Sequence, residues 1–258
     1  MIRYLRLLVL VGMIGNCAEL DTHRRYVGIS VKNPTGSAAI SADGLAAAYD
    51  FETYTSDGML RDFGPFGNHG KVKQKKETGG RFGKARVFSD VGDLVDLPEQ
   101  SSFNLDGPLT VATWIQITTL NLHQHIFACD DKFVLWVTPT NQYRFADTLG
   151  DAFTTEEGVV QTESWHSVVA VLYGTRGDSL TKDNIKIFVD GTQMEGSFGP
   201  VWAPTVLHPT DACHIGFESH QGQSRHQELQ FEGVVDELLV FSRALTDDEI
   251  QTHAERQQ

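Results

Sequence analysis

Residues 231–245 read FEGVVDELLVFSRAL, and TDDEI follows at residues 246–250. The first stretch has the alternation of a β-strand, in which every second residue shares a face. Apolar residues occur on both faces, so we expect both faces to be covered, and the two carboxylates in mid-strand then need partners or a route to water. The predicted faces are Val234, Asp236, Leu238 and Val240 on one side, and Val235, Glu237, Leu239 and Phe241 on the other.

After this strand, Thr246 is followed three residues later by Glu249, a capping-box pattern that predicts the start of a short terminal helix. Upstream, short apolar runs alternate with turn signals such as Asp190-Gly191. This spacing predicts an all-β domain, a two-sheet antiparallel jelly-roll sandwich with a short C-terminal helix. Besides 233–241, the candidate strands are 45–51, 69–73, 85–89, 94–97, 109–117, 126–129, 133–137, 143–145, 166–173, 185–189 and 214–217.

The N-terminus has the pattern of a secretory signal peptide. Arg3 and Arg6 precede an apolar run at residues 7–14, which is shorter than the roughly 18 residues that span a bilayer. We predict a signal peptide at residues 1–18, a polar linker at 19–43 and one domain at 44–258. Signal peptidase could cut near Cys17, or Cys17 could carry a lipid anchor, although Asn16 departs from the usual lipoprotein pattern. No later segment is apolar enough to predict a transmembrane helix.

Charge and cysteine content narrow the function. The net charge of −13 argues against a general nucleic-acid binder, which needs a positive field to displace counterions. Cys129 and Cys213 remain if Cys17 is removed or lipidated, and in an oxidising compartment they could form a disulfide. Both also have apolar neighbours that suit free buried cysteines, so the two alternatives stay open.

Seven segments, in order along the chain, resemble LamG-like (laminin G type 3) jelly rolls of the concanavalin A-like lectin/glucanase superfamily. The segment at 83–88 carries Arg86 where that family usually has leucine. The resemblance implies this fold and a recognition module rather than an enzyme, although one fold hosts many activities. The segments are GLAAAYDFE at 44–52, DFGPFGNHG at 62–70, GKARVF at 83–88, LTVATWI at 109–115, WHSVVA at 165–170, IFVDG at 187–191 and IG at 215–216.

Catalytic patterns are missing from the sequence. Glycoside hydrolases need two carboxylates facing one linkage, and the resembling hydrolases carry Glu-x-Asp-x-x-Glu on one strand, a spacing that does not occur here. Alternation also predicts that Asp236 and Glu237 point to opposite faces. We therefore predict that the protein is not an enzyme. The alternative is a glycoside hydrolase relative with a displaced carboxylate pair.

A structural calcium is a second hypothesis, since Ca²⁺ takes carboxylate, amide and carbonyl oxygens. Asp62 and Asn68 flank a glycine-rich loop, and Asp236 needs a partner for its charge. Jelly rolls of this type often join an early loop to the last strand through calcium, so the resemblance implies Asp62, Asn68 and Asp236 as ligands. Alternatively, Asp236 pairs with an arginine or accepts backbone hydrogen bonds, and Asp62 caps a turn.

Aromatic and basic residues provide candidates for ligand contact. Trp136, Tyr143 and Arg144 come from adjacent candidate strands, and Trp202 lies in a proline-rich loop. The alternative for Trp136 is a place in the core, whereas Trp202 is the tryptophan that we expect to be exposed. A basic cluster spans residues 71–86, in which alternation puts Lys71, Lys73 and Lys75 on one side of a strand. These lysines could hold an anionic polysaccharide, or they could be solvated charges that protect a sheet edge. His123 and His125 could share a strand face, but no Cys or Asp at fixed spacing completes a zinc site.

Together these features predict a non-catalytic extracellular recognition module, secreted or held at the cell-envelope surface. Its expected partner is a glycan or a cell-surface protein, not nucleic acid. A third hypothesis is an architectural cell-envelope domain that binds no small ligand.

Overall fold

The computed structural model describes residues 40–90, 92–98, 107–129, 133–147, 151–175, 181, 183–200, 213–216 and 230–256. The predicted signal peptide with Cys17, residues 19–39 of the predicted linker and Trp202 lie outside these ranges. Within them, no helix is both long and apolar enough to cross a membrane.

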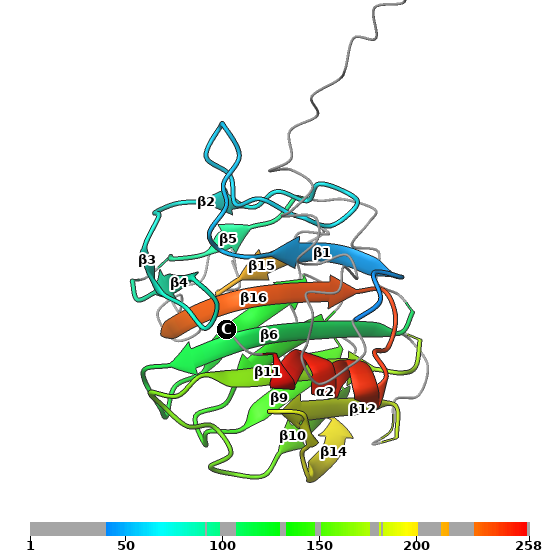
Figure 1. The fold of residues 1–258 in the computed structure, drawn as a ribbon. Helices are drawn as coiled ribbons and strands as arrows, with labels where there is room; N and C mark the ends of the chain where they lie inside the picture. Colours follow the sequence, from blue (N-terminus) through cyan, green and yellow to red (C-terminus); the bar gives the residue numbers. More distant parts are fainter. Residues whose placement is uncertain are drawn as a thin grey trace, which may run out of the picture.

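Two antiparallel β-sheets face each other as a sandwich (Figure 1), as the sequence predicts. The first sheet runs β13-β12-β11-β6-β16-β4-β3, with β1 also paired to β16. Its strands are β1 (Leu45–Tyr49), β3 (Glu77–Gly79), β4 (Lys84–Phe88), β6 (Leu109–Ile117), β11 (His166–Leu172), β12 (Ile185–Val189), β13 (Thr192–Gln193) and β16 (Gly233–Phe241).

The second sheet lies behind the first in Figure 1 and runs β14-β10-β9-β8-β7-β15-β5-β2. Its strands are β2 (Lys71–Val72), β5 (Val95–Asp96), β7 (Gln124–Cys129), β8 (Phe133–Val137), β9 (Tyr143–Asp147), β10 (Asp151–Thr155), β14 (Gly196–Pro200) and β15 (Cys213–Ile215).

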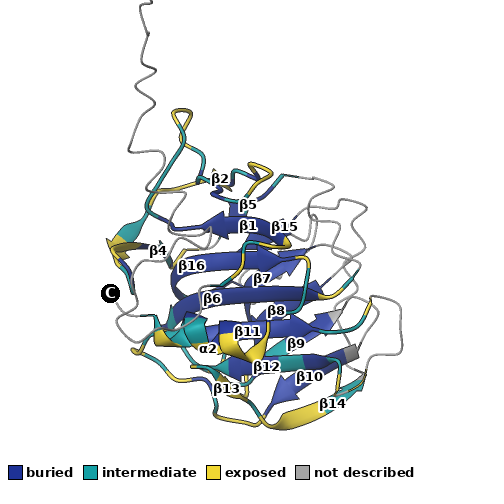
Figure 2. Ribbon diagram, turned by 45° about the vertical axis from the view of Figure 1, so that its right-hand side comes forward, coloured by how far each residue is buried: buried dark blue, intermediate teal, exposed yellow. Residues whose placement is uncertain are grey.

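The main core fills the space between the sheets. It joins inward residues of the first sheet, such as Ile115 and Val235, to inward residues of the second, such as Phe127 and Leu135. The strands of both sheets are therefore largely buried (Figure 2). A second apolar cluster lies on the outer face of the first sheet, because helix α2 (Asp247–Glu255) packs Ile250 there against Leu239 and its neighbours.

A β-bulge interrupts β16 at its acidic residues. Asp236 pairs with Trp114 of β6, but the next paired residue is Leu239, opposite Ala112, so β16 has one residue more than β6 in this interval. Glu237 takes φ 53°, a left-handed conformation that side chains rarely adopt. Unbroken alternation across the strand, as predicted from the sequence, is therefore wrong. Instead Val235, Leu238 and Val240 face the core together, whereas Leu239 and Phe241 face α2.

Helix α2 begins as the capping box predicts. The Thr246 side chain accepts a hydrogen bond from the Glu249 N–H, and the Glu249 carboxylate accepts the Thr246 N–H at 3.0 Å. Arg243 donates to both Glu249 oxygens at 2.7 Å. This pair lowers the pKa of Glu249 to about 2. Arg243 also donates to the carbonyls of Ser41 and Asp43, so the end of the predicted linker is anchored beside the helix.

The predicted strands 109–117, 133–137, 185–189 and 233–241 have the bounds found in the structure. The predicted strand 69–73 is shorter, since β2 covers only Lys71–Val72. Strands β3, β10, β13 and β14 were not predicted, because they are polar or contain glycine and lack the apolar alternation that marks a strand.

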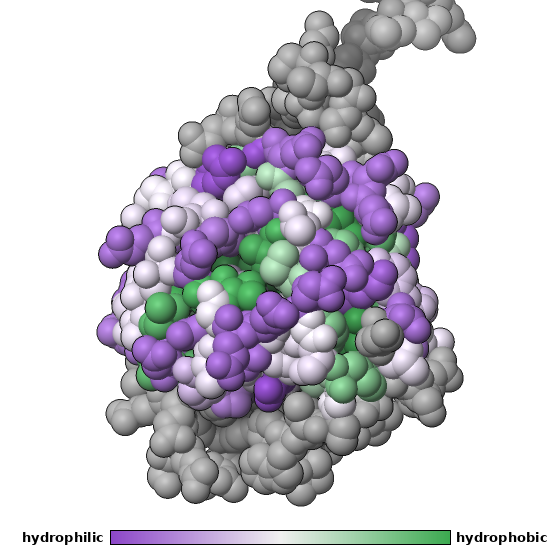
Figure 3. All heavy atoms as spheres, turned by 90° about the horizontal axis from the view of Figure 1, so that it is seen from below, coloured by the Kyte–Doolittle hydropathy of each residue, from purple (hydrophilic) through white to green (hydrophobic). Residues whose placement is uncertain are grey.

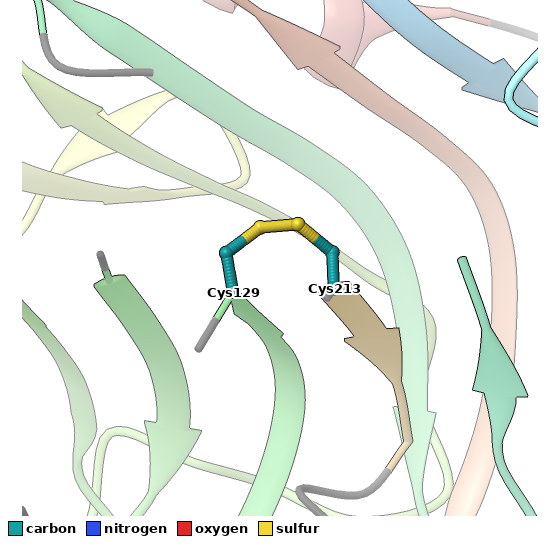
Figure 4. Close-up of a disulfide and its surroundings, with 2 residues drawn as sticks. All are labelled: Cys129 and Cys213. Carbon is teal, nitrogen blue, oxygen red and sulfur yellow. A yellow bond between two sulfur atoms is a disulfide. The ribbon is translucent and has the colours of Figure 1, made fainter. Parts of the chain in front are cut away.

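A disulfide joins Cys129, at the end of β7, to Cys213, at the start of β15 (Figure 4). The two residues are direct partners in the antiparallel ladder, and both are fully buried in the main core. This settles the alternative that the sequence left open. Because the pairing unites residues 84 positions apart, it is a contact that no local pattern reveals.

In the described part of the chain, Phe66 is the one large apolar residue that is exposed, at 57%. Seen from below the view of Figure 1, hydrophilic residues spread over most of the described surface and surround a central hydrophobic band (Figure 3).

Candidate ligand-binding face

A transverse row of side chains crosses the outer face of the second sheet, the face opposite the core. His125 of β7 pairs with Trp136 of β8, Trp136 with Arg144 of β9, and Arg144 with Thr154 of β10. Directly paired residues of an antiparallel sheet share a face. These four residues, with His123 just before β7, are called the recognition face below.

Trp136 is the centre of this recognition face. The His123 ring stacks on the indole at 5.9 Å between centroids, the His125 ring lies at 6.1 Å, and the Arg144 guanidinium carbon lies 5.6 Å from the ring centroid. Trp136 is only 2% exposed, whereas His123 and Arg144 are half-buried. The tryptophan is therefore a support, and the histidine and arginine are the members that a ligand can reach.

Arg144 is held in place by its neighbour on β10. Its Nε donates to Thr154 Oγ1 at 2.7 Å, and burial lowers its pKa from the usual value without neutralising it. Among the described residues, Thr154 is its only hydrogen-bond acceptor. A guanidinium fixed in this way is preorganised to donate to the hydroxyl or carboxylate oxygens of a ligand.

Small residues form a second row beside the first on the same outer face. Ala128, Val134, Ala146 and Ala152 pair in order from β7 to β10 and form an apolar cluster separate from the main core. The row continues on the other side of Ala128 through His214 of β15, Asp96 of β5 and Lys71 of β2. His214 Nδ1 lies 3.0 Å from Asp96 Oδ1.

Of the three residues predicted on adjacent strands, the structure brings Trp136 and Arg144 together and places Tyr143 elsewhere. Tyr143 points to the opposite side of β9, is 1% exposed and belongs to the main core, so including it in the ligand-binding set was wrong. His125 and Thr154 also belong to the recognition face, although neither was predicted as a ligand-binding residue. The histidine pair at 123 and 125 was the available signal, but only cross-strand pairing shows that it meets Trp136.

The basic cluster is dispersed rather than gathered in a row. Lys71, Lys73 and Lys75 are all exposed, but the strand alternation used to align them ends at Val72. Lys75 lies over the Tyr54 ring at 3.8 Å and pairs with Glu77 at 3.2 Å. Binding of a ligand by these three lysines stays a prediction.

The predicted calcium ligands occupy two different settings. Asp62 Oδ1 accepts the N–H groups of Ala48 and Gly64 at 2.8 and 2.7 Å, and Oδ2 accepts that of Asn68 at 2.7 Å. The Asn68 amide donates to the Ala46 carbonyl at 3.0 Å. These bonds fix the 62–68 loop on β1, and they already use the Asp62 oxygens that a metal would need.

Asp236 lies on the outer face of the first sheet with Glu237, so the prediction that they point to opposite faces is wrong. Asp236 Oδ2 accepts the Phe82 N–H at 2.8 Å, and Glu237 pairs with Arg256 at 2.8 Å. The Arg256 guanidinium in turn lies 4.3 Å from the Phe82 ring centroid. Burial, with a smaller contribution from the negative charge of Glu237, raises the pKa of Asp236 to about 8.

Neither carboxylate can meet a substrate in this arrangement, because Asp236 is 0% and Glu237 is 1% exposed. Calcium binding by Asp62, Asn68 and Asp236 stays a prediction, although both carboxylates accept backbone N–H groups. In the described ranges, no group of three or more His, Cys, Asp or Glu side chains is arranged to hold a metal ion. The residues present thus fit hydrogen-bonded structural roles better than a calcium site.

Comparison with solved structures finds the same fold in several carbohydrate-active and binding proteins. A Trypanosoma rangeli sialidase in complex with sialic acid superposes with a TM-score of 0.61 at 17% identity, covering 92% of this chain and 37% of the sialidase. Domain 4 of AbnA, a GH43 extracellular arabinanase from Geobacillus stearothermophilus in complex with arabinotriose, gives 0.53 at 18% identity, covering 82% of this chain and 98% of that domain.

The binding domain of Paraclostridial Mosquitocidal Protein 1 gives a TM-score of 0.58 at 14% identity, covering 83% of this chain and 52% of that domain. Identities this low establish the fold alone, and the chain spans little more than a third of the sialidase's length. Comparison with curated protein sequences finds no significant match.

The family model Laminin_G_3, described as Concanavalin A-like lectin/glucanases superfamily, matches residues 89–251. This range runs from the end of β4 into α2 and includes every strand of the recognition face. It also agrees with the resemblance seen in the sequence motifs. The chain therefore belongs to the concanavalin A-like lectin/glucanase superfamily, as a protein with a Laminin_G_3 domain.

Proposed function

We propose that this protein is a non-catalytic, extracytoplasmic glycan-recognition module whose ligand binds on the recognition face. The observation that carries the proposal is the row of paired side chains across β7–β10, in which Trp136 supports two reachable polar groups, His123 and Arg144. Sugar recognition depends on a few fixed hydrogen-bonding groups, and in this row the buried Trp136 holds His123 and Arg144 in place for that role.

Two further observations support the proposal. Helix α2 packs on the outer face of the first sheet. On the outer face of the second sheet, His123 and Arg144 are half-buried beside the buried Trp136. The Cys129–Cys213 disulfide favours an oxidising compartment, in agreement with the predicted signal peptide at residues 1–18.

The absence of catalysis is part of the proposal. It is supported by the burial and hydrogen bonding of the two carboxylates in β16. Asp236 and Glu237, the two carboxylates of β16, are buried and engaged with Phe82 and Arg256. A structural calcium is not part of the proposal, because the Asp62 oxygens accept backbone N–H groups instead.

A glycan array probed with the full mature chain tests this proposal, followed by calorimetric titration of the strongest glycan. Arg144→Gln is expected to lower affinity about tenfold or more, the effect of losing a charged hydrogen-bond donor. Lys186→Gln is the matched control, because Lys186 is half-buried on the first sheet, away from the recognition face. The Lys186→Gln variant should bind the glycan with the affinity of the wild type.

Absence of binding to any glycan would refute the proposal and favour an architectural envelope domain. Release of reducing sugar from the bound glycan, abolished by Asp236→Asn, would instead show a hydrolase. Equal affinity of wild type and Arg144→Gln would place the ligand on another surface.

A further inference from the structure

Arg86 is a charged residue in a core position. On β4 it pairs directly with Val235 of β16, which faces the main core, and it lies on the same side of β4 as Phe88. Its side chain is 0% exposed, and its guanidinium carbon lies 5.1 Å from the Phe88 ring centroid. The guanidinium is therefore enclosed at the β3–β4 side of the sandwich.

The guanidinium has no charged partner within hydrogen-bonding geometry. Nε, Nη1 and Nη2 are all buried, and none makes a well-aligned hydrogen bond in the described part of the chain. The neighbour within hydrogen-bonding reach is the Tyr54 hydroxyl, which is also buried and carries no charge to compensate that of Arg86. A buried charge without a partner is strongly unfavourable.

The nearby carboxylates are engaged elsewhere. Asp93 accepts Lys76 Nζ at 2.7 Å and the N–H groups of Ser89 and Asp90 at 3.1 and 2.9 Å. Its negative charge reaches Arg86 only at a distance.

Glu77, the partner of Arg86 across β3 and β4, shares its oxygens between two lysines, with Lys75 at 3.2 Å and Lys84 at 3.0 Å. Neither carboxylate compensates the Arg86 charge directly.

Neutralisation of Arg86 by loss of a proton does not solve the problem. Burial lowers the pKa of Arg86, but arginine starts from a pKa so high that it stays charged in proteins. The N–H groups of Arg86 need acceptors, and its positive charge needs a negative one. A single anion supplies both.

We propose that Arg86, together with the Tyr54 hydroxyl, binds a small anion enclosed between the sheets, of the size of chloride or formate. The guanidinium supplies two parallel N–H donors and the charge, and the phenol supplies a third donor. Lys75, whose ammonium lies 3.8 Å from the Tyr54 ring centroid, adds positive potential next to the site. This site is separate from the recognition face, and it stabilises the β3–β4 end of the domain.

Thermal unfolding of the full mature chain at constant ionic strength tests the proposal. Sodium chloride and sodium formate are compared with sodium gluconate, whose anion is too large to be enclosed. At ten times the dissociation constant of the small anion, the wild type is expected to melt about 3–6 °C higher than in gluconate. Arg86→Leu should show no such difference, whereas Lys73→Gln, which removes an exposed neighbouring charge, should keep it.

Tyr54→Phe provides a milder test in case Arg86→Leu does not fold, since it removes one hydroxyl from a half-exposed ring. The anion-dependent shift should become smaller but stay measurable. Crystals grown in sodium bromide should show anomalous density within hydrogen-bonding distance of the guanidinium. Equal melting of the wild type in all three salts, or water in place of bromide beside Arg86, would overturn the proposal.

Discussion

The disulfide between β7 and β15 offers the clearest quantitative prediction. Replacing both cysteines, Cys129→Ala with Cys213→Ala, removes a link between directly paired residues that are fully buried. β15 is three residues long and lies between β7 and β5, with which it forms antiparallel pairs. The disulfide adds a covalent link to these pairs.

The magnitude follows from the separation of 84 residues between the two cysteines. In the chain-entropy model, opening a loop of this length returns about 4.5 kcal/mol of conformational freedom to the unfolded chain. Losing two buried sulfur atoms adds roughly 1 kcal/mol of packing, while imperfect geometry generally reduces the entropic part. We expect a net loss of about 4 kcal/mol, a large share of the roughly 5–15 kcal/mol typical of a domain.

Guanidinium chloride unfolding, followed by tryptophan fluorescence, measures this loss from the wild type and the double variant without reductant. As a control, a reductant should move the wild-type transition toward that of the double variant and leave the double variant unchanged. A difference below about 1 kcal/mol would refute the reasoning. Alkylation of both Cys129 and Cys213 in wild-type protein unfolded without reductant would also refute it, because a disulfide blocks this reaction.

Two further predictions concern buried acids. Asp236 has a folded-state pKa of about 8, above its ordinary 3.8, so the folded protein keeps a proton that the unfolded chain has lost at intermediate pH. The contribution of the Asp236 carboxyl to stability is complete below about pH 4 and declines as the pH rises to about 8. Asp236→Asn should abolish this decline in the melting temperature. Parallel pH profiles of the wild type and the variant would contradict the prediction. Asp62→Ala leaves three backbone N–H groups without an acceptor, and we expect a loss of about 2–4 kcal/mol. This loss should be the same in EDTA and in calcium chloride, whereas a loss confined to calcium buffer would support the metal hypothesis.

Local patterns were sufficient for the elements whose signals lie within a few residues. The apolar runs of β6, β8, β12 and β16, bounded by turn residues, predicted their bounds, and Thr246 with Glu249 predicted the start of α2. In each case the information is contained in the period of the apolar residues or in one short-range hydrogen-bonding pair. The edge strands β3, β13 and β14 escaped this approach, because a strand at the side of a sheet needs little apolar burial.

The candidate sites depended on contacts between distant parts of the chain. The sequence placed Trp136 near Arg144 but also included Tyr143, because spacing alone does not say which face of a strand is covered by the other sheet. Arg86 was grouped with solvated charges, although pairing with Val235 carries it into the core.

By itself, the sequence determined that this protein is a two-sheet antiparallel sandwich with a capped terminal helix, because apolar period and turn residues act locally. Only the tertiary structure decided that Asp236 and Glu237 share a face, that Cys129 meets Cys213 and that Arg86 is enclosed. The physical reason is that a one-residue bulge reverses every later side chain, and that burial depends on which strands become neighbours.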